Sequence, residues 1–117
     1  MRPIAILALL PALLLGSAGA LAHAYLDRAS PLVGSTVASS PAQVILYFTQ
    51  NLERRFSRVE VRNAAGARVD LGNVSVSGSV IRVGIRGLAP GRYSVHWRVL
   101  SVDTHTTEGH FGFNVGR

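Results

Sequence analysis

Short runs of alternating or β-branched residues, separated by turn residues, recur along the chain between residues 44 and 115. They are 44–49, 58–62, 68–71, 74–77, 80–85, 92–100 and 106–115. Gly66, Gly78 and Pro90-Gly91 stand at turns between them, and no stretch of helical periodicity follows residue 23. Alternation with a period of two residues is typical of strands. About seven short strands in one small domain predict an all-β fold, an antiparallel β-sandwich of Ig-like or Greek-key type.

The run 92–100 shows the alternation most clearly. The residues of one face are Tyr93, Val95, Trp97 and Val99, and those of the other face are Ser94, His96 and Arg98. We therefore expect Trp97, the single tryptophan, at the centre of the core. In the run 106–115 we expect Phe111, Phe113 and Val115 to point into the same core.

The first 22 residues have the pattern of a secretory signal peptide. Arg2 supplies the positive charge, residues 4–15 are apolar, and Ala20-Leu21-Ala22 forms a small-residue cleavage site. A retained membrane anchor is the less favoured alternative, because a spanning helix needs about 20 apolar residues. We expect residues 23–117 to be a single exported domain that does not span the membrane and resides in the periplasm or another extracytoplasmic space. The chain contains no cysteine, so that domain must be stabilised by its apolar core.

The charge balance is basic, with 12 cationic residues, all arginine, against 6 acidic residues. Such a surface could contact nucleic acid, anionic lipid or an acidic protein. The arginines are spread along the chain and alternate with apolar residues, which is typical of the solvated outer faces of strands. An exported protein also seldom meets nucleic acid, so we expect no nucleic-acid binding.

Cleavage after Ala22 would make His23 the first residue of the mature protein. A free α-amino group and an imidazole on one residue form a chelate for a metal that prefers nitrogen, above all Cu(II). The position of the cleavage site therefore makes His23 a candidate metal ligand.

Asp103-Thr104-His105 supplies a second pair of metal-capable side chains. In an extended segment, residues two apart project to the same side, about 7 Å apart at the backbone. Both side chains could bind one metal ion, or Asp103 could orient the imidazole of His105. Alternatively, Asp103 caps a loop beside a histidine that has no metal to bind.

The remaining histidines are expected on the surface, with His110, and likewise Glu108, as a less favoured extra ligand of the metal. His96 shares the polar face of its run with Arg98, and His110 lies on the face opposite the phenylalanines, as does Glu108. No serine or threonine stands in a pattern that suggests a nucleophile with its base, and phosphate-binding glycine loops are absent. The sequence therefore predicts no catalytic residues.

Several segments together resemble one family. They are His23-Ala24, Ala29-Ser30-Pro31 with Gly34, Ser40-Pro41 before residues 44–48, Leu88-Ala89-Pro90-Gly91-Arg92-Tyr93, Val95, Trp97-Arg98-Val99, and Ser101-Val102-Asp103-Thr104-His105 followed by Gly109, Phe111 and Phe113. In order and spacing these segments resemble the CopC family of periplasmic copper-resistance proteins, over essentially all of residues 23–117.

The resemblance implies a cupredoxin-like or Ig-like β-sandwich that binds one Cu(II) ion at one end. It assigns the amine and imidazole to His23, a second imidazole to His105 and a nearby carboxylate to Asp103. Three nitrogens and one oxygen suit the tetragonal preference of Cu(II).

The sequence departs from the family pattern at two points. Gln50 stands where family members often have an acidic residue, and glutamine is the poorer copper ligand. Some members also have a methionine-rich loop for Cu(I), whereas residues 23–117 contain neither methionine nor cysteine. A soft Cu(I) site is therefore not expected.

These observations predict an exported Cu(II) carrier or chaperone for copper homeostasis or resistance, not an enzyme. Its expected partners are the copper ion and a membrane copper transporter or copper-acceptor protein. One alternative is a copper-dependent oxidative enzyme that uses an N-terminal histidine brace, which hydrogen peroxide production would reveal. Another is an Ig-like interaction module without a metal, which a metal titration would exclude.

Overall fold

The computed structural model describes residues 24–116, so the predicted leader and His23 lie outside the described residues. The described chain contains eight strands and one short 3-10 helix. The strands are β1 (Leu26–Ser30), β2 (Thr36–Val37), β3 (Gln43–Phe48), β4 (Arg58–Asn63), β5 (Ser75–Ser77), β6 (Val80–Gly84), β7 (Gly91–Leu100) and β8 (Thr106–Val115). The helix, η3 (Arg54–Phe56), precedes β4. Within these residues no helix has the length and apolarity needed to cross a membrane.

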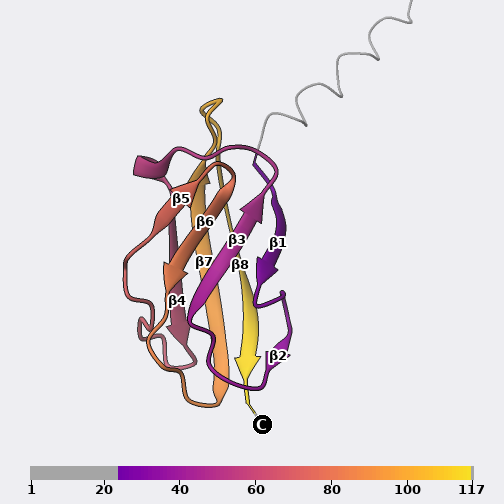
Figure 1. The fold of residues 1–117 in the computed structure, drawn as a ribbon, viewed down its shortest axis with the longest axis vertical. Coiled ribbons are helices and arrows are strands. Elements are labelled where there is room, and N and C mark those ends of the chain that lie inside the picture. The colour runs from indigo at the N-terminus through magenta and orange to yellow at the C-terminus, as the bar shows by residue number, and fades with distance from the viewer. Residues whose placement is uncertain (1–23, 117) are drawn as a thin grey trace, which may run out of the picture.

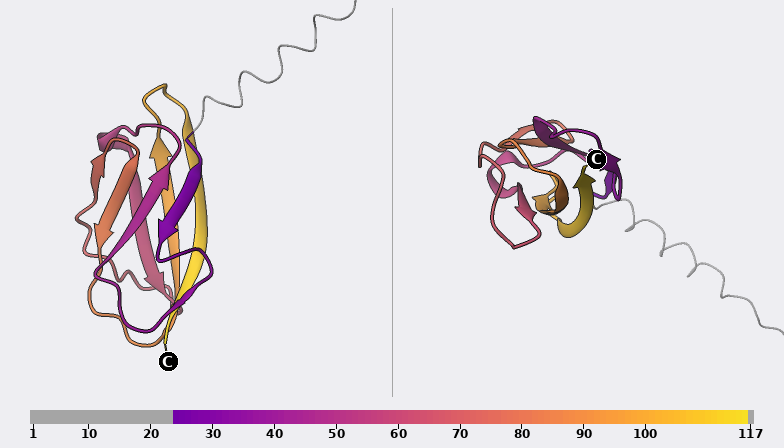
Figure 2. Two further views of the ribbon diagram at one scale, coloured as in Figure 1. Left: turned by 45° about the vertical axis from the view of Figure 1, so that its right-hand side comes forward. Right: turned by 90° about the horizontal axis from the view of Figure 1, so that it is seen from below.

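The strands form two sheets that pack face to face (Figures 1 and 2). One sheet has the order β1-β3-β6-β5 and the other the order β2-β8-β7-β4. Strand β2 pairs with β8 in parallel, and the other pairs are antiparallel. The prediction of an all-β sandwich is therefore confirmed.

The prediction of about seven strands is corrected to eight. Residues 68–71 are not a strand, because they make only isolated bridges through Arg68 and Asp70. Conversely, β1 and β2 were not predicted. Strand β1 buries only Ala29 and contains a bulge, and β2 has two residues, so neither shows the alternation on which the prediction relied.

Alternation in β7 and β8 builds the centre of the core. The predicted inward residues of both strands, including Trp97 and Phe113, are all buried. The Trp97 ring meets Phe48 of the opposite sheet edge to face, with ring centroids 5.0 Å apart. Gly109, the cross-strand partner of Trp97, allows this placement, because a Cβ there would lie 2.6 Å from the indole Cζ2. Trp97 and Gly109 thus pack closely between β7 and β8, near the end of β7 that leads into the loop 101–105.

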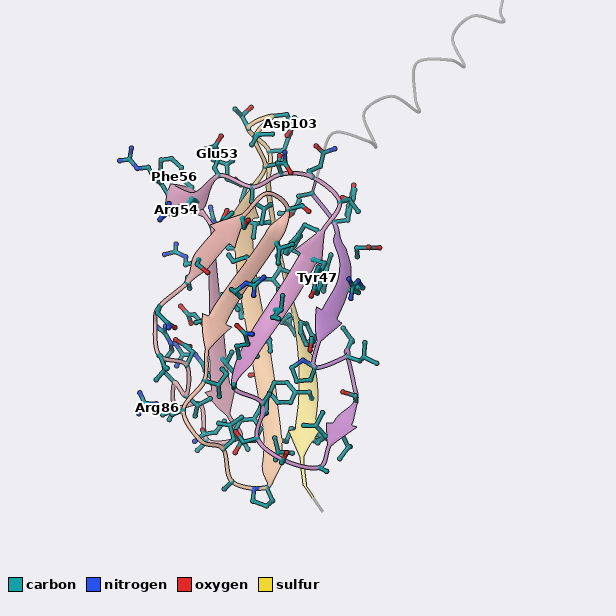
Figure 3. All side chains as sticks on the ribbon, viewed as in Figure 1. Tyr47, Glu53, Arg54, Phe56, Arg86 and Asp103 are labelled. Atoms are coloured by element: carbon teal, nitrogen blue, oxygen red, sulfur yellow. The ribbon has the colours of Figure 1, made fainter. Side chains whose placement is uncertain are left out.

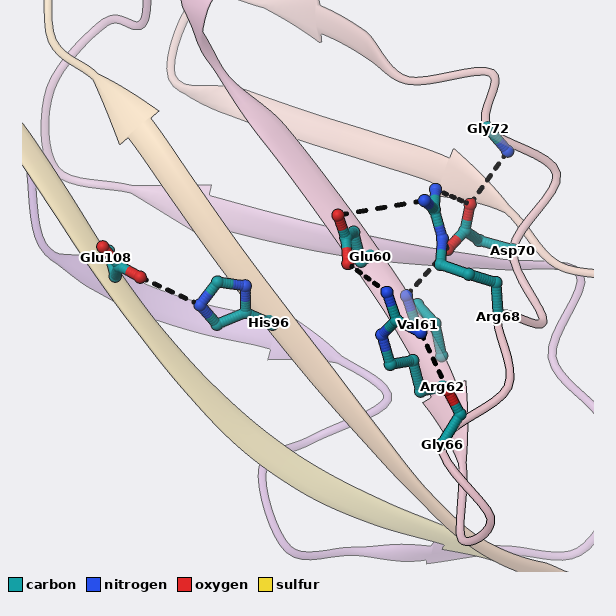
Figure 4. Close-up of polar contacts among 9 residues, drawn as sticks. All are labelled: Glu60, Val61, Arg62, Gly66, Arg68, Asp70, Gly72, His96 and Glu108. Atoms are coloured by element: carbon teal, nitrogen blue, oxygen red, sulfur yellow. Dashed lines mark hydrogen bonds and ion pairs between the residues drawn. The ribbon is translucent and has the colours of Figure 1, made fainter.

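One buried carboxylate, that of Asp70, lies at the β4 edge of the β2-β8-β7-β4 sheet. Asp70 accepts hydrogen bonds from the backbone N–H of Val61 at 2.8 Å, from that of Gly72 at 2.9 Å, and from two guanidinium nitrogens of Arg68 at 2.8 and 2.9 Å (Figure 4). Burial alone raises the pKa of the Asp70 carboxyl, but the hydrogen bonds from Arg68 and the backbone outweigh it, so the pKa lies below its ordinary value.

We expect Asp70→Asn to lower the free energy of unfolding at pH 7 by about 2–3 kcal/mol, because hydrogen bonds to a charged group contribute about 1.5–3 kcal/mol. A carboxyl whose pKa is lower in the folded state stabilises the fold above its unfolded-state pKa of about 3.9. This contribution is lost as the pH falls through the lower, folded-state pKa. Urea unfolding measured between pH 2 and pH 7 should therefore show a shallower acid dependence for the variant.

Asp27→Asn is the matched control, since Asp27 is exposed on β1. It should change the free energy of unfolding by less than about 0.5 kcal/mol. Equal losses in the two variants would contradict the role assigned to Asp70.

Candidate metal centre

The loop 101–105 joins β7 to β8 and projects beyond one end of the sandwich (Figure 1). The described chain begins at this same end, where residues 24 and 25 lead into β1. Asp103 lies at the tip of the loop in Figure 3, not far from η3. The loop that carries Asp103 and His105 therefore lies at the end of the fold where the described chain begins.

Buried Ser101 organises the loop. Its backbone N–H donates to the carbonyl of His105 at 2.9 Å, and its carbonyl accepts from the N–H of Thr104 at 2.9 Å. Its hydroxyl donates to the Asp103 carboxylate and accepts from the N–H of His105 at 3.3 Å. Thr104 has a positive φ of 72°. These bonds define a tight turn that holds Asp103 and His105 together.

The structure places Asp103 and His105 in direct contact. Asp103 Oδ1 lies 3.5 Å from His105 Nδ1, and the side chains retain 37% and 47% of their accessible surface. Because the carboxylate lies against Nδ1, Nε2 is the ring nitrogen suited to bind a metal ion. The hydrogen bond from Ser101, followed by the interaction with His105, lowers the pKa of the Asp103 carboxyl, so Asp103 is anionic at neutral pH.

Ala24, the residue that follows His23 in the sequence, is anchored beside this loop. Thr107 Oγ1 donates a hydrogen bond to the carbonyl of Ala24 at 2.8 Å, and Ala24 is fully buried. Tyr25 makes two hydrogen bonds with Thr49. Its backbone N–H donates to Thr49 Oγ1 at 2.9 Å, and its carbonyl accepts from the backbone N–H of Thr49 at 3.0 Å. Ala24, the residue after His23, is thus held against Thr107, which follows His105 by two residues in the sequence. His23 itself lies outside the described residues.

Gln50, the position that departs from the family pattern, belongs to the same end of the molecule. The next residue, Asn51, accepts a hydrogen bond from the N–H of Val102 at 3.0 Å, and Leu52 bridges to Ser101. Gln50 is half-buried. The segment that carries it therefore runs beside the loop 101–105.

The other histidines lie away from this end, on the outer face of the sheet, as expected. His96 Nε2 is 3.1 Å from Glu108 Oε2 (Figure 4), and His96 is the cross-strand partner of His110. His110 is five residues beyond His105 along β8, which is about 16 Å at about 3.3 Å per residue. This spacing separates His110 from the Asp103–His105 pair.

At this end the described residues bring two metal-capable side chains together, those of Asp103 and His105. Within residues 24–116 no group of three or more histidine, cysteine, aspartate or glutamate side chains is placed to hold a metal ion. Two structural residues of the site, Ser101 and Thr107, were given no role from the sequence. Ser101 contributes a hydrogen bond within a turn, and Thr107 contributes one to a residue 83 positions earlier in the chain. Neither bond leaves a periodic pattern in the sequence.

Comparison with known proteins identifies relatives of the whole described domain. The model of the CopC domain family matches residues 26–116. The chain is 33% identical over 123 residues to "Copper resistance protein C" of Xanthomonas campestris pv. juglandis, covering 97% of this chain and 96% of that protein. It is 31% identical over 100 residues to "Copper transport protein CutJ" of Bacillus subtilis (strain 168), covering 82% of this chain but only 18% of CutJ.

A solved structure agrees with these sequence relationships. The crystal structure of CopC from Methylosinus trichosporium OB3b superposes with a TM-score of 0.76 at 32% identity, and the match covers 80% of this chain and 94% of that one. The sandwich and its strand order are therefore shared with a protein of the same domain type.

Proposed function

The chain belongs to the CopC domain family, and on that premise we propose that it is an exported carrier that binds one Cu(II) ion and passes it to another protein. The observation that carries this proposal is the hydrogen bond from Thr107 to Ala24. It fixes the residue after His23 beside the strand that begins at Thr106, directly after His105. The residue next to the proposed N-terminal ligand is thus held beside the strand that follows His105.

In this proposal the leader 1–22 is removed on export and His23 becomes the N-terminus. His23 then contributes its α-amine and imidazole, and His105 contributes Nε2. Asp103 holds the His105 ring by Nδ1 and adds negative charge close to the ion. Nitrogen and oxygen donors without sulfur suit Cu(II) better than Cu(I).

The proposed role is transport rather than catalysis. Asp103 and His105 remain substantially exposed in a loop that projects beyond the sandwich, so a partner protein can reach the ion directly. The names of the relatives, copper resistance and copper transport proteins, agree with this role. A membrane transporter or a copper-acceptor protein would be the partner in the exchange.

A competition titration tests the oxidation state and the stoichiometry. Secreted protein that begins at His23, verified by intact mass, should withdraw one equivalent of Cu(II) from a Cu(II) chelator. It should withdraw negligible Cu(I) from a Cu(I) chelator, because the proposed ligand set contains no thiolate or thioether. Tight Cu(I) binding, or no Cu(II) binding by correctly processed protein, would contradict the proposal.

A further inference from the structure

A hollow lies on the outer face of the β2-β8-β7-β4 sheet, at the end that carries the loop 101–105. It is formed by η3, the start of β4, the end of β7 and the start of β8. Its lining residues are Arg55, Phe56, Ser57, Arg58, Arg98, Leu100 and Thr106. Thr106 directly follows His105, so one edge of this hollow, which we call the arginine hollow, adjoins the proposed copper site.

The arginine hollow has an excess of positive charge. Arg58 and Arg98 are cross-strand partners, an arrangement that places two like charges opposite each other and is unfavourable by itself. Arg98 is partly compensated by Glu108, whose Oε1 lies 3.5 Å from Arg98 Nη1, but Glu108 also contacts His96. Within the described residues neither Arg55 nor Arg58 has a carboxylate within ion-pair distance. Arg55 and Arg58 thus present guanidinium groups that no carboxylate of the described residues neutralises.

The same end also exposes large apolar side chains. Phe56 in η3 is 63% exposed and Val102 in the copper-site loop is 49% exposed. The guanidinium of Arg55 lies 5.8 Å from the centre of the Phe56 ring. Aromatic residues and arginine are the residue types enriched in protein–protein interfaces.

The backbone that presents these side chains is firmly held. Ser57, buried directly after η3, accepts a hydrogen bond from the N–H of Leu100 at 3.1 Å. Glu53, which precedes η3, donates its backbone N–H to the carbonyl of Leu100 at 2.8 Å. Both bonds tie η3 to the end of β7, so the hollow is preformed and a ligand need not order it.

We propose that the arginine hollow is the docking site for an acidic segment of the protein with which this chain exchanges copper. The inference rests on the proposed function for the identity of the partner. Carboxylates of that segment would pair with Arg55 and Arg58, and its apolar side chains would cover Phe56. A partner docked there would contact Thr106, the residue directly after His105. A concave site with an aromatic wall fits a protein segment better than the flat surface of a lipid bilayer.

The test uses an N-acetylated, C-amidated hexaglutamate peptide as the probe, with the secreted protein free of copper. Titration followed by amide NMR should shift the signals of residues 54–58, 98–100 and 106. Arg55→Gln/Arg58→Gln should weaken the binding of the peptide about fivefold or more, since each exposed ion pair contributes a modest amount. The matched control is Arg82→Gln/Arg86→Gln, which removes the same charge from β6 and the loop after it, remote from the hollow (Figure 3 labels Arg86). It should weaken binding less than about twofold.

Equal weakening in the two double variants, or shifted signals spread over the whole surface, would show a general charge effect and overturn the proposal.

Vesicles of phosphatidylglycerol and phosphatidylcholine form a second arm of the test. If Arg55→Gln/Arg58→Gln loses vesicle binding but keeps peptide binding, the hollow is a membrane site and the proposal is wrong. The Cu(II) affinity of this variant should equal that of the unmodified protein. Because the peptide titration needs no copper, failure of the docking site and failure of the copper site are read separately.

Discussion

One residue added before His23 is expected to lower the affinity of the secreted protein for Cu(II) roughly 10³-fold or more. The extension converts the α-amine into an amide and breaks the chelate ring, while His105 and the imidazole of His23 remain. Loss of an outer partner of a metal ligand already costs roughly 10–100-fold in affinity, and here a ligand and its ring are lost together. Chelator competition at pH 7 measures the change.

The matched control for this extension is one residue added after Arg117, which alters length and not the N-terminus. It should leave the affinity unchanged. Cu(II) must displace protons from the α-amine, whose reference pKa is about 7.7–8.0. The affinity of the native form should therefore fall as the pH drops below neutrality. Binding by the N-terminally extended protein as tight as that of the native protein would show that copper sits elsewhere.

His105→Ala is expected to weaken Cu(II) binding roughly 10²-fold, a smaller loss than the extension causes. The variant removes the single described imidazole at this end, but leaves the amine–imidazole pair of His23 able to hold copper loosely. Since His105 is exposed and its backbone bonds to Ser101 do not need the side chain, the fold should tolerate the change. Isothermal titration calorimetry with a competing ligand measures the loss, and urea unfolding checks stability.

His96→Ala is the matched control, because His96 is a histidine of similar exposure on the outer face of β7. It should change the Cu(II) affinity less than about twofold. A loss in His96→Ala as large as that in His105→Ala would place the ion on the sheet face near His110. No loss in His105→Ala would remove this histidine from the site.

The parts of the fold that could be predicted are those in which one face of a strand is buried. In β7 and β8 alternation identified the inward residues, including Trp97 and Phe113, because a two-residue period and burial on one side determine each other. Residues 68–71 show the limit of this reasoning. They alternate, yet Asp70 turns inward to satisfy backbone N–H groups, so the segment bridges two strands and is not a strand itself.

The proposed site could likewise be predicted from the sequence only in part. The spacing of Asp103 and His105 indicated that they could act together, and they do lie in contact. The reason differs from the expected one, since a turn around Ser101 with a positive φ at Thr104, and not an extended segment, joins them. The link from Thr107 to Ala24 connects distant parts of the chain and leaves no local pattern. Long-range hydrogen bonds of this kind become visible only once the sheets are assembled.

Electron paramagnetic resonance of the protein loaded with one equivalent of Cu(II) reports directly on the ligands of the proposed copper site. We expect a tetragonal spectrum with nitrogen coupling from three donors, the α-amine and two imidazoles. In His105→Ala one imidazole coupling should disappear, and in the N-terminally extended protein the amine coupling should disappear. A native spectrum without imidazole coupling, or one that neither change alters, would contradict a copper site built from His23 and His105.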